Sequence, residues 1–494
     1  TSGEAMVDGR STEQPDDQRA EAGGHRRLKA ALFLLGCCAA GLAPHWLEPG
    51  RSLLPSIVLA VLLGSYSIRT VLLNPPTLAG QARPPGGPSA DTAGCAAQHD
   101  LSSPASATLP LPAVDVVVAA RDEQAVIRRL VGRIANLRYP TGQLLLWVID
   151  DGSEDRTPEL LDELQDREPL LRVLRRSRQA GGGKSGALNL VLPQLQGRWL
   201  LVLDADADLQ DDTLERLIPW AEAGGWSAVQ LRKAVANPDT NLLTRAQAME
   251  MAFDAVIQQG RLCAGGVAEL RGNGQLLRRD AIQACGGFNE ATVTDDLDLS
   301  MRLLLEGEPI GVLWDPPVQE EAVLTLPALW RQRQRWAEGG LQRFLDYTPG
   351  LLSDRLNNRQ KTDLFSFFVL QYMMPVMAAA DLAGVLATGT PPAMWPFSIV
   401  ALSLSGIAIV SGCRRPSEGP PLPRMSLGAV TLGVVYLVHW FAVIPWVTLR
   451  MAVLPKRLVW AKTLHLGAEM EIEAASAEGS SEKDGELAAE GGPL

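Results

Sequence analysis

Long apolar runs lie near both ends of the chain, and each approaches the roughly 20 residues that a membrane-spanning helix needs. The N-terminal part holds two of them, at residues 30–43 and 53–68. The C-terminal part holds three more, at residues 364–387, 394–411 and 427–453. The pattern predicts two transmembrane helices within residues 26–73 and about three transmembrane or re-entrant segments within residues 363–453.

Positive charges flank the first two runs, and short cytoplasmic loops are enriched in such charges. The flanking residues are Arg26, Arg27, Lys29, Arg69 and Arg83. We therefore expect an integral membrane protein whose central domain faces the cytoplasm. The last run fits this rule poorly, because a full crossing would leave the basic residues after it outside. We expect it to bend at Pro445 or to lie partly in the interface.

The region between the two apolar ends, residues 112–325, has a different pattern. Apolar runs of strand length at residues 115–119, 144–149 and 199–203 alternate with helical patterns. This alternation is typical of an α/β domain with a mostly parallel sheet that helices cover on both faces. In such sheets ligands bind beyond the carboxyl ends of the strands.

The other segments are polar or mixed. Residues 1–25 and the acidic residues 467–494 contain few large apolar side chains, so we expect disorder there, and residues 74–111 have the composition of a linker. Residues 326–350 mix arginines with Trp and Leu, which is typical of an interfacial amphipathic helix on anionic lipid. That simple interpretation of Arg331, Arg333 and Arg335 does not exclude a catalytic role.

The amino-acid composition limits the class of protein and the side chains that could carry out its chemistry. Hydrophobic residues make up 46% of the chain and charged residues 20%, which favours a membrane protein. The net charge of −11 argues against a nucleic-acid partner, which needs a basic surface. The six cysteines lack C-x-x-C spacing and the five histidines are scattered, so carboxylates are the expected chemical groups.

Acidic residues follow each of the three predicted strands. Each acid alone is most simply explained as a cap of the next helix. Together they would repel one another at one edge of the sheet unless a cation or a ligand compensates them. The acids are Asp122 and Glu123 after the first strand, Asp150 and Asp151 after the second, and Asp204 and Asp206 after the third.

Asp204 and Asp206 form a D-x-D motif, whose alternate side chains can face the same way and offer two hard oxygen ligands. Mg²⁺ or Mn²⁺ suits such ligands and completes its shell with water and phosphate oxygens, so a diphosphate is the expected partner. Lys184 follows three glycines and can place a cation near that diphosphate or its sugar. The glycine run lacks the spacing of a P-loop.

A second acidic cluster opens an amphipathic helix at residues 294–303. Its acids, Asp295, Asp296 and Asp298, lie in the first turn, where the helix dipole favours negative charge. The cluster is a base, a metal site or only a capped helix start. A segment with Gln332, Arg335 and Trp336 follows it further along the chain.

These motifs, in this order, resemble the series found in membrane-bound family 2 glycosyltransferases. The resemblance covers residues 112–346 and departs at Asp295, where the family usually has Glu, so the charge is kept. It implies a GT-A-like sheet domain inserted between N- and C-terminal transmembrane helices. The motifs are Asp150-Asp151-Gly152-Ser153, Lys184 with Ala187-Leu188-Asn189, Asp204-Ala205-Asp206, Gly272-Asn273-Gly274, Thr294-Asp295-Asp296 and Gln332-x-x-Arg335-Trp336.

The resemblance also implies roles for single residues. It implies that Asp151 contacts the nucleotide of a UDP-sugar donor, and that Asp204 and Asp206 hold the sugar diphosphate through Mg²⁺ or Mn²⁺. Asp296 is then the general base, and an inverting displacement transfers the sugar. The remaining assignments place Asp122, Glu123 and Lys184 at the nucleotide-sugar, and Gln332, Arg335 and Trp336 at the acceptor and diphosphate side, with Arg335 stabilising the leaving charge.

Within the family, residues 334–343 and 458–465 resemble cyanobacterial members that glucosylate diacylglycerol from UDP-glucose. The expected partners are thus a UDP-sugar and a membrane lipid. The nearest alternative is a processive β-glycan synthase. A transporter or scaffold with a vestigial nucleotide fold is a further alternative. A dinucleotide oxidoreductase is disfavoured because no G-x-G-x-x-G follows the first strand.

Overall fold

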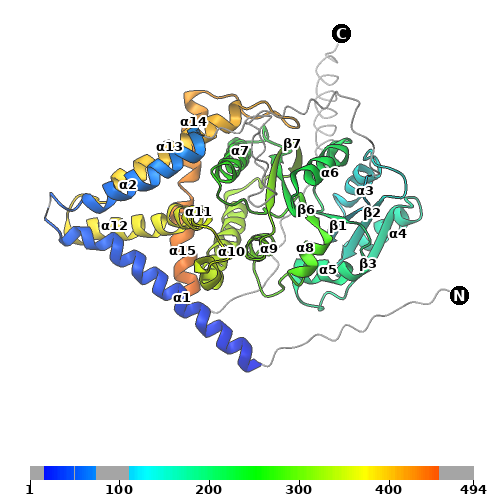
Figure 1. Ribbon diagram of the computed structural model, residues 1–494, viewed down its shortest axis with the longest axis horizontal. Coiled ribbons are helices and arrows are strands. Elements are labelled where there is room, and N and C mark those ends of the chain that lie inside the picture. Colours follow the sequence, from blue (N-terminus) through cyan, green and yellow to red (C-terminus); the bar gives the residue numbers. More distant parts are fainter. Residues whose placement is uncertain (1–15, 49, 74–110, 455–494) are drawn as a thin grey trace, which may run out of the picture.

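The computed structural model describes residues 16–48, 50–73 and 111–454, with side chains from His25 onward (Figure 1). An α/β domain lies on one side and a group of long helices on the other. The domain is built on a seven-stranded sheet of order β3-β2-β1-β4-β6-β5-β7. The strands are β1 (Val114–Ala120), β2 (Leu144–Asp150), β3 (Leu171–Arg175), β4 (Trp199–Leu203), β5 (Ala228–Val235), β6 (Gln275–Arg278) and β7 (Ile310–Glu320).

The sheet is mostly parallel, as expected. β1 pairs in parallel with β2 and β4, so the carboxyl ends of the three predicted strands lie side by side. β6 is the exception, because it runs antiparallel to both of its neighbours, β4 and β5. β7 was not predicted as a strand, since its consecutive residues Pro316 and Pro317 disfavour a sheet position.

Helices cover both faces of the sheet. Alternate residues of β1 point to opposite sides, so Val116 and Val118 pack with α3, α4 and α6, whereas Val117 and Ala119 pack with α5, α8 and α9. The two layers bury every residue of the central strands β1 and β4. The helices of the domain are α3 (Ile127–Ala135), α4 (Thr157–Gln165), α5 (Gly183–Val191), α6 (Thr213–Gly224), α7 (Leu242–Cys263), α8 (Arg279–Ala284) and α9 (Asp295–Leu305).

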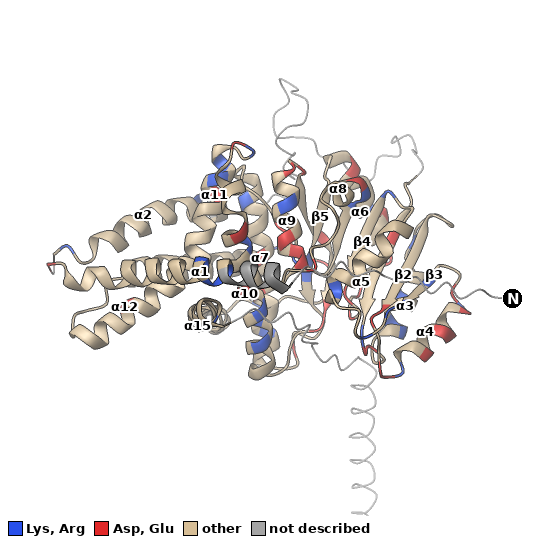
Figure 2. Ribbon diagram, turned by 90° about the horizontal axis from the view of Figure 1, so that it is seen from below, with Lys and Arg blue, Asp and Glu red and all other residues tan. Residues whose placement is uncertain are grey.

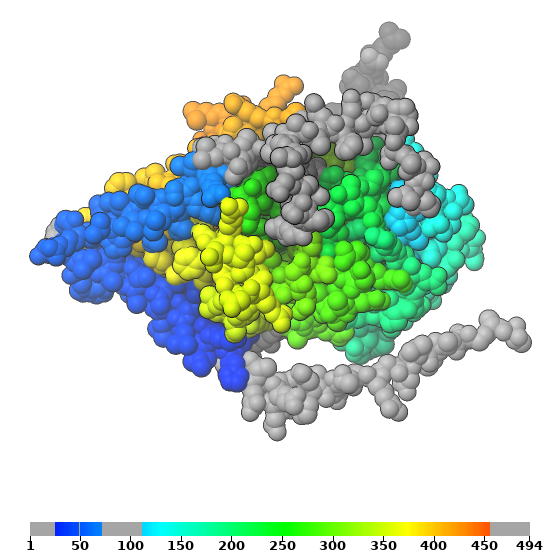
Figure 3. Space-filling model, viewed as in Figure 1, coloured from blue at the N-terminus to red at the C-terminus, as the bar shows by residue number. Residues whose placement is uncertain are grey.

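The second part consists of long apolar helices that extend away from the sheet (Figures 1 and 2). Within the described residues, five helical stretches are long and apolar enough to cross a membrane. Figure 3 shows the N-terminal helices packed beside segments from the C-terminal third, and α1 and α12 are in contact. The helices are α1 (Asp16–Leu42), α2 (Leu54–Ile68), α10 (Leu326–Leu352), α11 (Asn358–Phe368), α12 (Met374–Thr388), α13 (Trp395–Arg414), α14 (Leu427–Leu437) and α15 (Trp440–Val453).

The last apolar run bends, but not where the sequence placed the bend. α14 ends at Leu437 and α15 begins at Trp440, while Pro445 lies inside α15. α15 runs across the long axes of α1 and α12, and it packs against both and against α10 (Figures 1 and 2). Arg450 at its end bonds to Gln334 of α10 at 3.0 Å, so this charge stays beside the α/β domain.

Helix α10 lies between the α/β domain and the apolar helices, and several of its charged residues are buried, which the simple interpretation did not expect. Arg333 is fully buried and contacts Glu250 of α7. Glu338, also buried, contacts Arg26 and Arg450. Arg331 is exposed. The prediction was wrong for Arg333 because tertiary ion pairs replace the lipid headgroups that an isolated basic helix would need.

Three of the segments predicted from the sequence lie partly or wholly outside the residues that the structure describes. Residues 1–15, 74–110 and 455–494 lie outside the described ranges, and with them most of the predicted linker and the whole acidic tail. The expected disorder of residues 1–25 is wrong from Asp16, where α1 begins. Residues 18–22 within it are Gln, Arg, Ala, Glu and Ala, which are good helix formers.

Candidate active site

The D-x-D motif follows β4 at the edge of the sheet. Lys184 reaches Asp204 with 2.6 Å between its Nζ and Oδ1, so the cation predicted near the diphosphate lies directly on the first acid of the motif. Asp206 is buried, and its Oδ2 accepts a hydrogen bond of 3.0 Å from the backbone N–H of Glu321. The structure therefore brings Lys184, Asp204 and Asp206 together as the sequence predicted.

The glycine run before α5 forms the turn that places Lys184. Gly181, Gly182 and Gly183 all have positive φ, which glycine adopts at no steric cost. Arg176 fastens this turn to β2, because its guanidinium contacts the carbonyl of Gly183 at 3.2 Å and Asp151 Oδ1 at 3.3 Å. Burial raises the pKa of Asp151, although Arg176 and Arg121 oppose that shift.

Asp122 and Glu123 follow β1 at the same edge. Asp122 has φ of 55°, which is rare for a residue with a side chain, and its Oδ1 accepts a hydrogen bond of 2.7 Å from the backbone of Glu154. The strained turn joins the first two strand ends. Asp122 and Asp151 therefore organise the loops of this edge, and their predicted contacts with a nucleotide remain predictions.

Helix α9 begins with the second acidic cluster. Asp296 is partly exposed, while one oxygen of Asp295, Oδ2, is buried without a hydrogen bond. Burial and the neighbouring Asp295 raise the pKa of Asp296 to about 6, although the backbone N–H of Leu297 and then Lys184 and Arg271 oppose that shift. A carboxylate with such a pKa holds a proton more strongly than an ordinary one, as a general base must.

The third acid of the cluster, Asp298, has a structural role. Its carboxylate accepts hydrogen bonds from Arg302 at 2.7 Å, Asn289 at 2.9 Å and Tyr347 at 2.9 Å. These bonds tie α9 to the preceding loop and to α10. The structure thus separates the cluster into Asp298, which is saturated, and the Asp295–Asp296 pair.

Helix α10 packs directly on the start of α9. A Cβ at Gly339 would overlap the side chain of Thr294, so only glycine allows this approach. One to two turns before it, α10 carries Gln332, Arg335 and Trp336. Lys233 of β5 lies 5.3 Å from the centre of the Trp336 ring, which brings the predicted Arg-Trp motif to the edge of the sheet.

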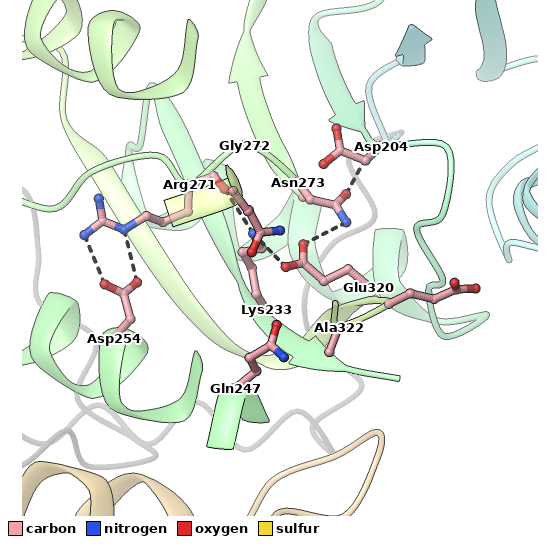
Figure 4. Close-up of polar contacts among 12 residues, drawn as sticks. Asp204, Lys233, Gln247, Asp254, Arg271, Gly272, Asn273, Glu320 and Ala322 are labelled. Atoms are coloured by element: carbon pink, nitrogen blue, oxygen red, sulfur yellow. Dashed lines mark hydrogen bonds and ion pairs between the residues drawn. The ribbon is translucent and has the colours of Figure 1, made fainter. Parts of the chain in front are cut away.

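Three charged residues at the site, Lys233, Arg271 and Glu320, were not predicted from the sequence. Figure 4 shows how the predicted Asn273 connects to one of them: it lies between the ends of β4 and β7 and is bonded to the backbone of Asp204 at 3.1 Å and to Glu320 at 3.4 Å. Glu320 also pairs with Lys233 at 2.8 Å. Arg271 makes two contacts of 3.1 Å with Asp254. Only Arg271 carried a signal, since it directly precedes the predicted Gly272-Asn273-Gly274 loop.

One cavity of about 480 Å³ connects these groups with the apolar helices. Its polar limb is lined by the predicted residues Glu123, Lys184, Asp204, Asp206, Asp296, Gln332, Arg335 and Trp336, together with Lys233, Arg271 and Glu320. Its apolar limb is lined by Phe367, Leu370, Met374, Pro375, Ala401, Leu402, Leu437 and Phe441. The lining does not include Asp122 or Asp151. A polar reactant and an apolar one can therefore meet in a single cavity.

The donor set at Asp204 and Asp206 suits a hard divalent cation. Within the described residues, no group of three or more His, Cys, Asp or Glu side chains could hold a metal by itself. Mg²⁺ and Mn²⁺ do not need such a cage, because one or two carboxylates with water and substrate phosphates suffice. The position of Lys184 on Asp204 shows that a positive charge is accommodated there.

Comparison with known sequences agrees with this geometry. Residues 112–339 match the family described as "Glycosyltransferase like family 2". The chain is 42% identical over 452 residues to a beta-monoglucosyldiacylglycerol synthase of Synechocystis sp., covering 89% of this chain and 88% of that protein. It is 45% identical over 361 residues to the protein of the same name in Nostoc sp., covering 72% and 77%.

A solved structure shares the fold. A mannosyltransferase of Pyrobaculum calidifontis, solved in complex with GDP-Man and Mn²⁺, superposes with a TM-score of 0.51 at 19% identity. The match covers 76% of this chain and 97% of that one. The predicted GT-A-like fold is thereby confirmed.

Proposed function

Because the chain belongs to the family 2 glycosyltransferases, we propose that it transfers glucose from UDP-glucose to the free hydroxyl of diacylglycerol and forms β-monoglucosyldiacylglycerol. The observation that carries this proposal is the single cavity with a polar limb at the sheet edge and an apolar limb among the membrane helices. The names of the Synechocystis and Nostoc relatives support the same sugar and lipid.

The residues of the polar limb fit a single displacement. Asp296, with a pKa of about 6, takes the proton of the acceptor hydroxyl while that oxygen attacks the anomeric carbon. The attack occurs from the face opposite the diphosphate, so an α-linked donor gives a β-linked product. Asp204 and Asp206 would hold Mg²⁺ or Mn²⁺, which would neutralise charge on the leaving diphosphate. Lys184 and Arg335 stabilise the same charge from the protein side.

The charges also support a cytoplasmic catalytic domain. Arg414 and Arg415 at the end of α13 lie beside the α/β domain, where Arg415 contacts Gln259. The loop at residues 389–394, at the far ends of α12 and α13, is uncharged. This asymmetry follows the positive-inside rule if the α/β domain is cytoplasmic. A cysteine placed at the exposed Pro391 is then expected to react with an impermeant maleimide on intact cells, above the wild-type background.

The decisive experiment supplies the purified chain in lipid vesicles with diacylglycerol and, separately, labelled UDP-glucose, UDP-galactose or UDP-N-acetylglucosamine. The expected product is a lipid carrying one β-linked glucose, identified by mass and by its anomeric NMR signal. Polymers of increasing length would favour a processive β-glycan synthase instead. Absence of product with all three donors would refute the donor assignment.

A further inference from the structure

Gln371 is a polar residue among the apolar side chains of the cavity's apolar limb. It lies on the continuous helix that α11 and α12 form. Phe367, four residues before it, and Met374, three residues after it, lie on the same helix face and line the cavity, as does the adjacent Leu370. Gln371 therefore lies in the middle of an apolar stripe that faces the cavity.

The backbone around Gln371 is unusual. Residues 369–373 form a π-helical turn between α11 and α12. Such turns are rare, and they occur often at functional sites because the extra residue redirects the side chains. Here three consecutive residues, Leu370, Gln371 and Tyr372, all line the cavity. In a regular α-helix of 3.6 residues per turn, three consecutive side chains spread over more than half of the circumference.

The side-chain amide of Gln371 has two donor hydrogens and one acceptor oxygen. In the described part of the chain it makes no hydrogen bond to another residue. An amide in apolar surroundings without a partner is costly, and polar groups within membrane segments usually contact a ligand, another polar group or water. The position therefore suits a bound molecule that is mostly apolar and offers one polar atom to the amide of Gln371.

We propose that Gln371 donates a hydrogen bond to an ester carbonyl of the acceptor lipid and so sets how deeply the acceptor enters the cavity. This inference rests on the proposed function, because it assumes a diacylglycerol acceptor. An acyl ester has the required chemistry, since it offers a carbonyl oxygen at the head of a hydrocarbon chain. The chain occupies the apolar limb beside Phe367, Leu370 and Met374.

Helix α10 packs both against the start of α9, which carries the base, and against the helix that carries Gln371. A Cβ at Gly339 would overlap Thr294, at the start of α9, and a Cβ at Gly340 would overlap the hydroxyl of Tyr372. Thr294, two residues before Asp296, and Tyr372, next to Gln371, therefore lie against adjacent glycines of α10. The free hydroxyl and the ester carbonyl of diacylglycerol are only a few bonds apart, so both can be engaged at once.

The test compares acceptors with and without the carbonyl. A dialkylglycerol replaces both esters by ethers but keeps the hydroxyl and the chains. Removing one neutral hydrogen bond costs about 0.5–1.5 kcal/mol, which corresponds to a roughly 2- to 12-fold change in kcat/KM. The wild type should prefer the ester by that factor, and Gln371→Met, which keeps the volume, should abolish the preference. The KM for UDP-glucose should not change.

Thr431→Val is the matched control, because Thr431 is an exposed polar residue of a membrane helix whose hydroxyl donates to its own helix at Leu427. It should retain the ester preference. Hydrolysis of UDP-glucose without acceptor reports whether each variant is folded. Equal loss of ester and ether transfer in Gln371→Met, or no ester preference in the wild type, would overturn the role of Gln371. Failure of the wild type to glucosylate either lipid would instead refute the proposed function.

Discussion

Two pairs of carboxylates line the cavity, and they differ in whether a lysine contacts them directly. Asp204 and Asp206 follow a strand, and Lys184 lies 2.6 Å from the first of them. Asp295 and Asp296 open a helix, and Asp295 raises the pKa of Asp296 by more than either Lys184 or Arg271 lowers it. In the first pair, Asp204 is in direct contact with a positive charge. In the second pair, burial and the neighbouring Asp295 make Asp296 bind a proton more strongly than an ordinary carboxylate does.

Lys184 makes the contrast sharper because it lies near both pairs. Burial lowers the pKa of Lys184, but Asp204 and then Asp295 raise it by more, so the ammonium remains charged. Among the described residues, Lys184 forms an ion pair only with Asp204. Pairs of acids whose environments push their proton affinities apart are how an active site divides binding from acid–base chemistry.

The largest effect is expected when Asp296, the proposed base of the second pair, is replaced. Asp296→Asn keeps the shape of the side chain but cannot accept the proton, so kcat should fall by about 10²- to 10⁴-fold. The KM for UDP-glucose should change little, because donor binding is assigned to the other pair. Steady-state kinetics with labelled UDP-glucose and diacylglycerol measures both values.

Asp280→Asn is the matched control for that variant. Asp280 is also an acid in the first turn of a helix, α8, but it is exposed and does not line the cavity. Its loss should leave kcat within twofold of the wild type, on the order of the small effects of surface substitutions. A similar kcat for Asp296→Asn and the wild type would show that Asp296 is not the base.

The next largest effect concerns the cation pair. Asp204→Asn removes a proposed direct ligand of the metal. Its effect on Mn²⁺ affinity should therefore at least equal the roughly 10- to 100-fold that loss of an outer-sphere partner costs. Titration of Mn²⁺ in the presence of UDP, followed by EPR, measures binding without catalysis. Asp296→Asn should bind Mn²⁺ like the wild type. Equal weakening by both variants would mean that the two pairs do not have separate tasks.

The acidity of Asp296 predicts an intermediate effect in the wild type. A base with a pKa of about 6 is charged at pH 8 and mostly protonated at pH 5. Transfer should therefore fall about tenfold per pH unit below pH 6 and be nearly constant above pH 7. The profile of kcat/KM for the acceptor tests this. A rate that stays constant down to pH 4.5 would contradict the raised pKa.

The sequence predicted the parts of this site that depend on local order. The ends of β1, β2 and β4 carry the expected acids because parallel neighbours place their carboxyl ends together. The helical start at Asp295 was also expected. Neither prediction needs knowledge of distant contacts, since strand length, strand direction and helix capping are local properties.

The parts that were missed depend on contacts between distant segments. Lys233 and Glu320 are 87 positions apart by their numbers and meet only because β5 and β7 are neighbours in the sheet. The burial of Arg333 requires Glu250 from α7, and periodicity alone describes Arg333 as a surface residue. Likewise, the need for glycine at position 339 comes from the contact with Thr294, which is distant in the sequence.

The smallest expected effect tests the coupling within the second pair. Asp295 raises the pKa of Asp296 because two negative charges on adjacent residues repel each other. Asp295→Asn removes that repulsion, so the pKa of Asp296 should fall and the acid limb of the profile should move to lower pH. The variant should therefore be relatively more active than the wild type at pH 5, when each is scaled to its own value at pH 8. An unchanged limb, or one moved to higher pH, would mean that burial alone sets the acidity of Asp296. The two acids would then be neighbours without being a functional pair, and the contrast with Asp204 and Asp206 would reduce to the contact with Lys184.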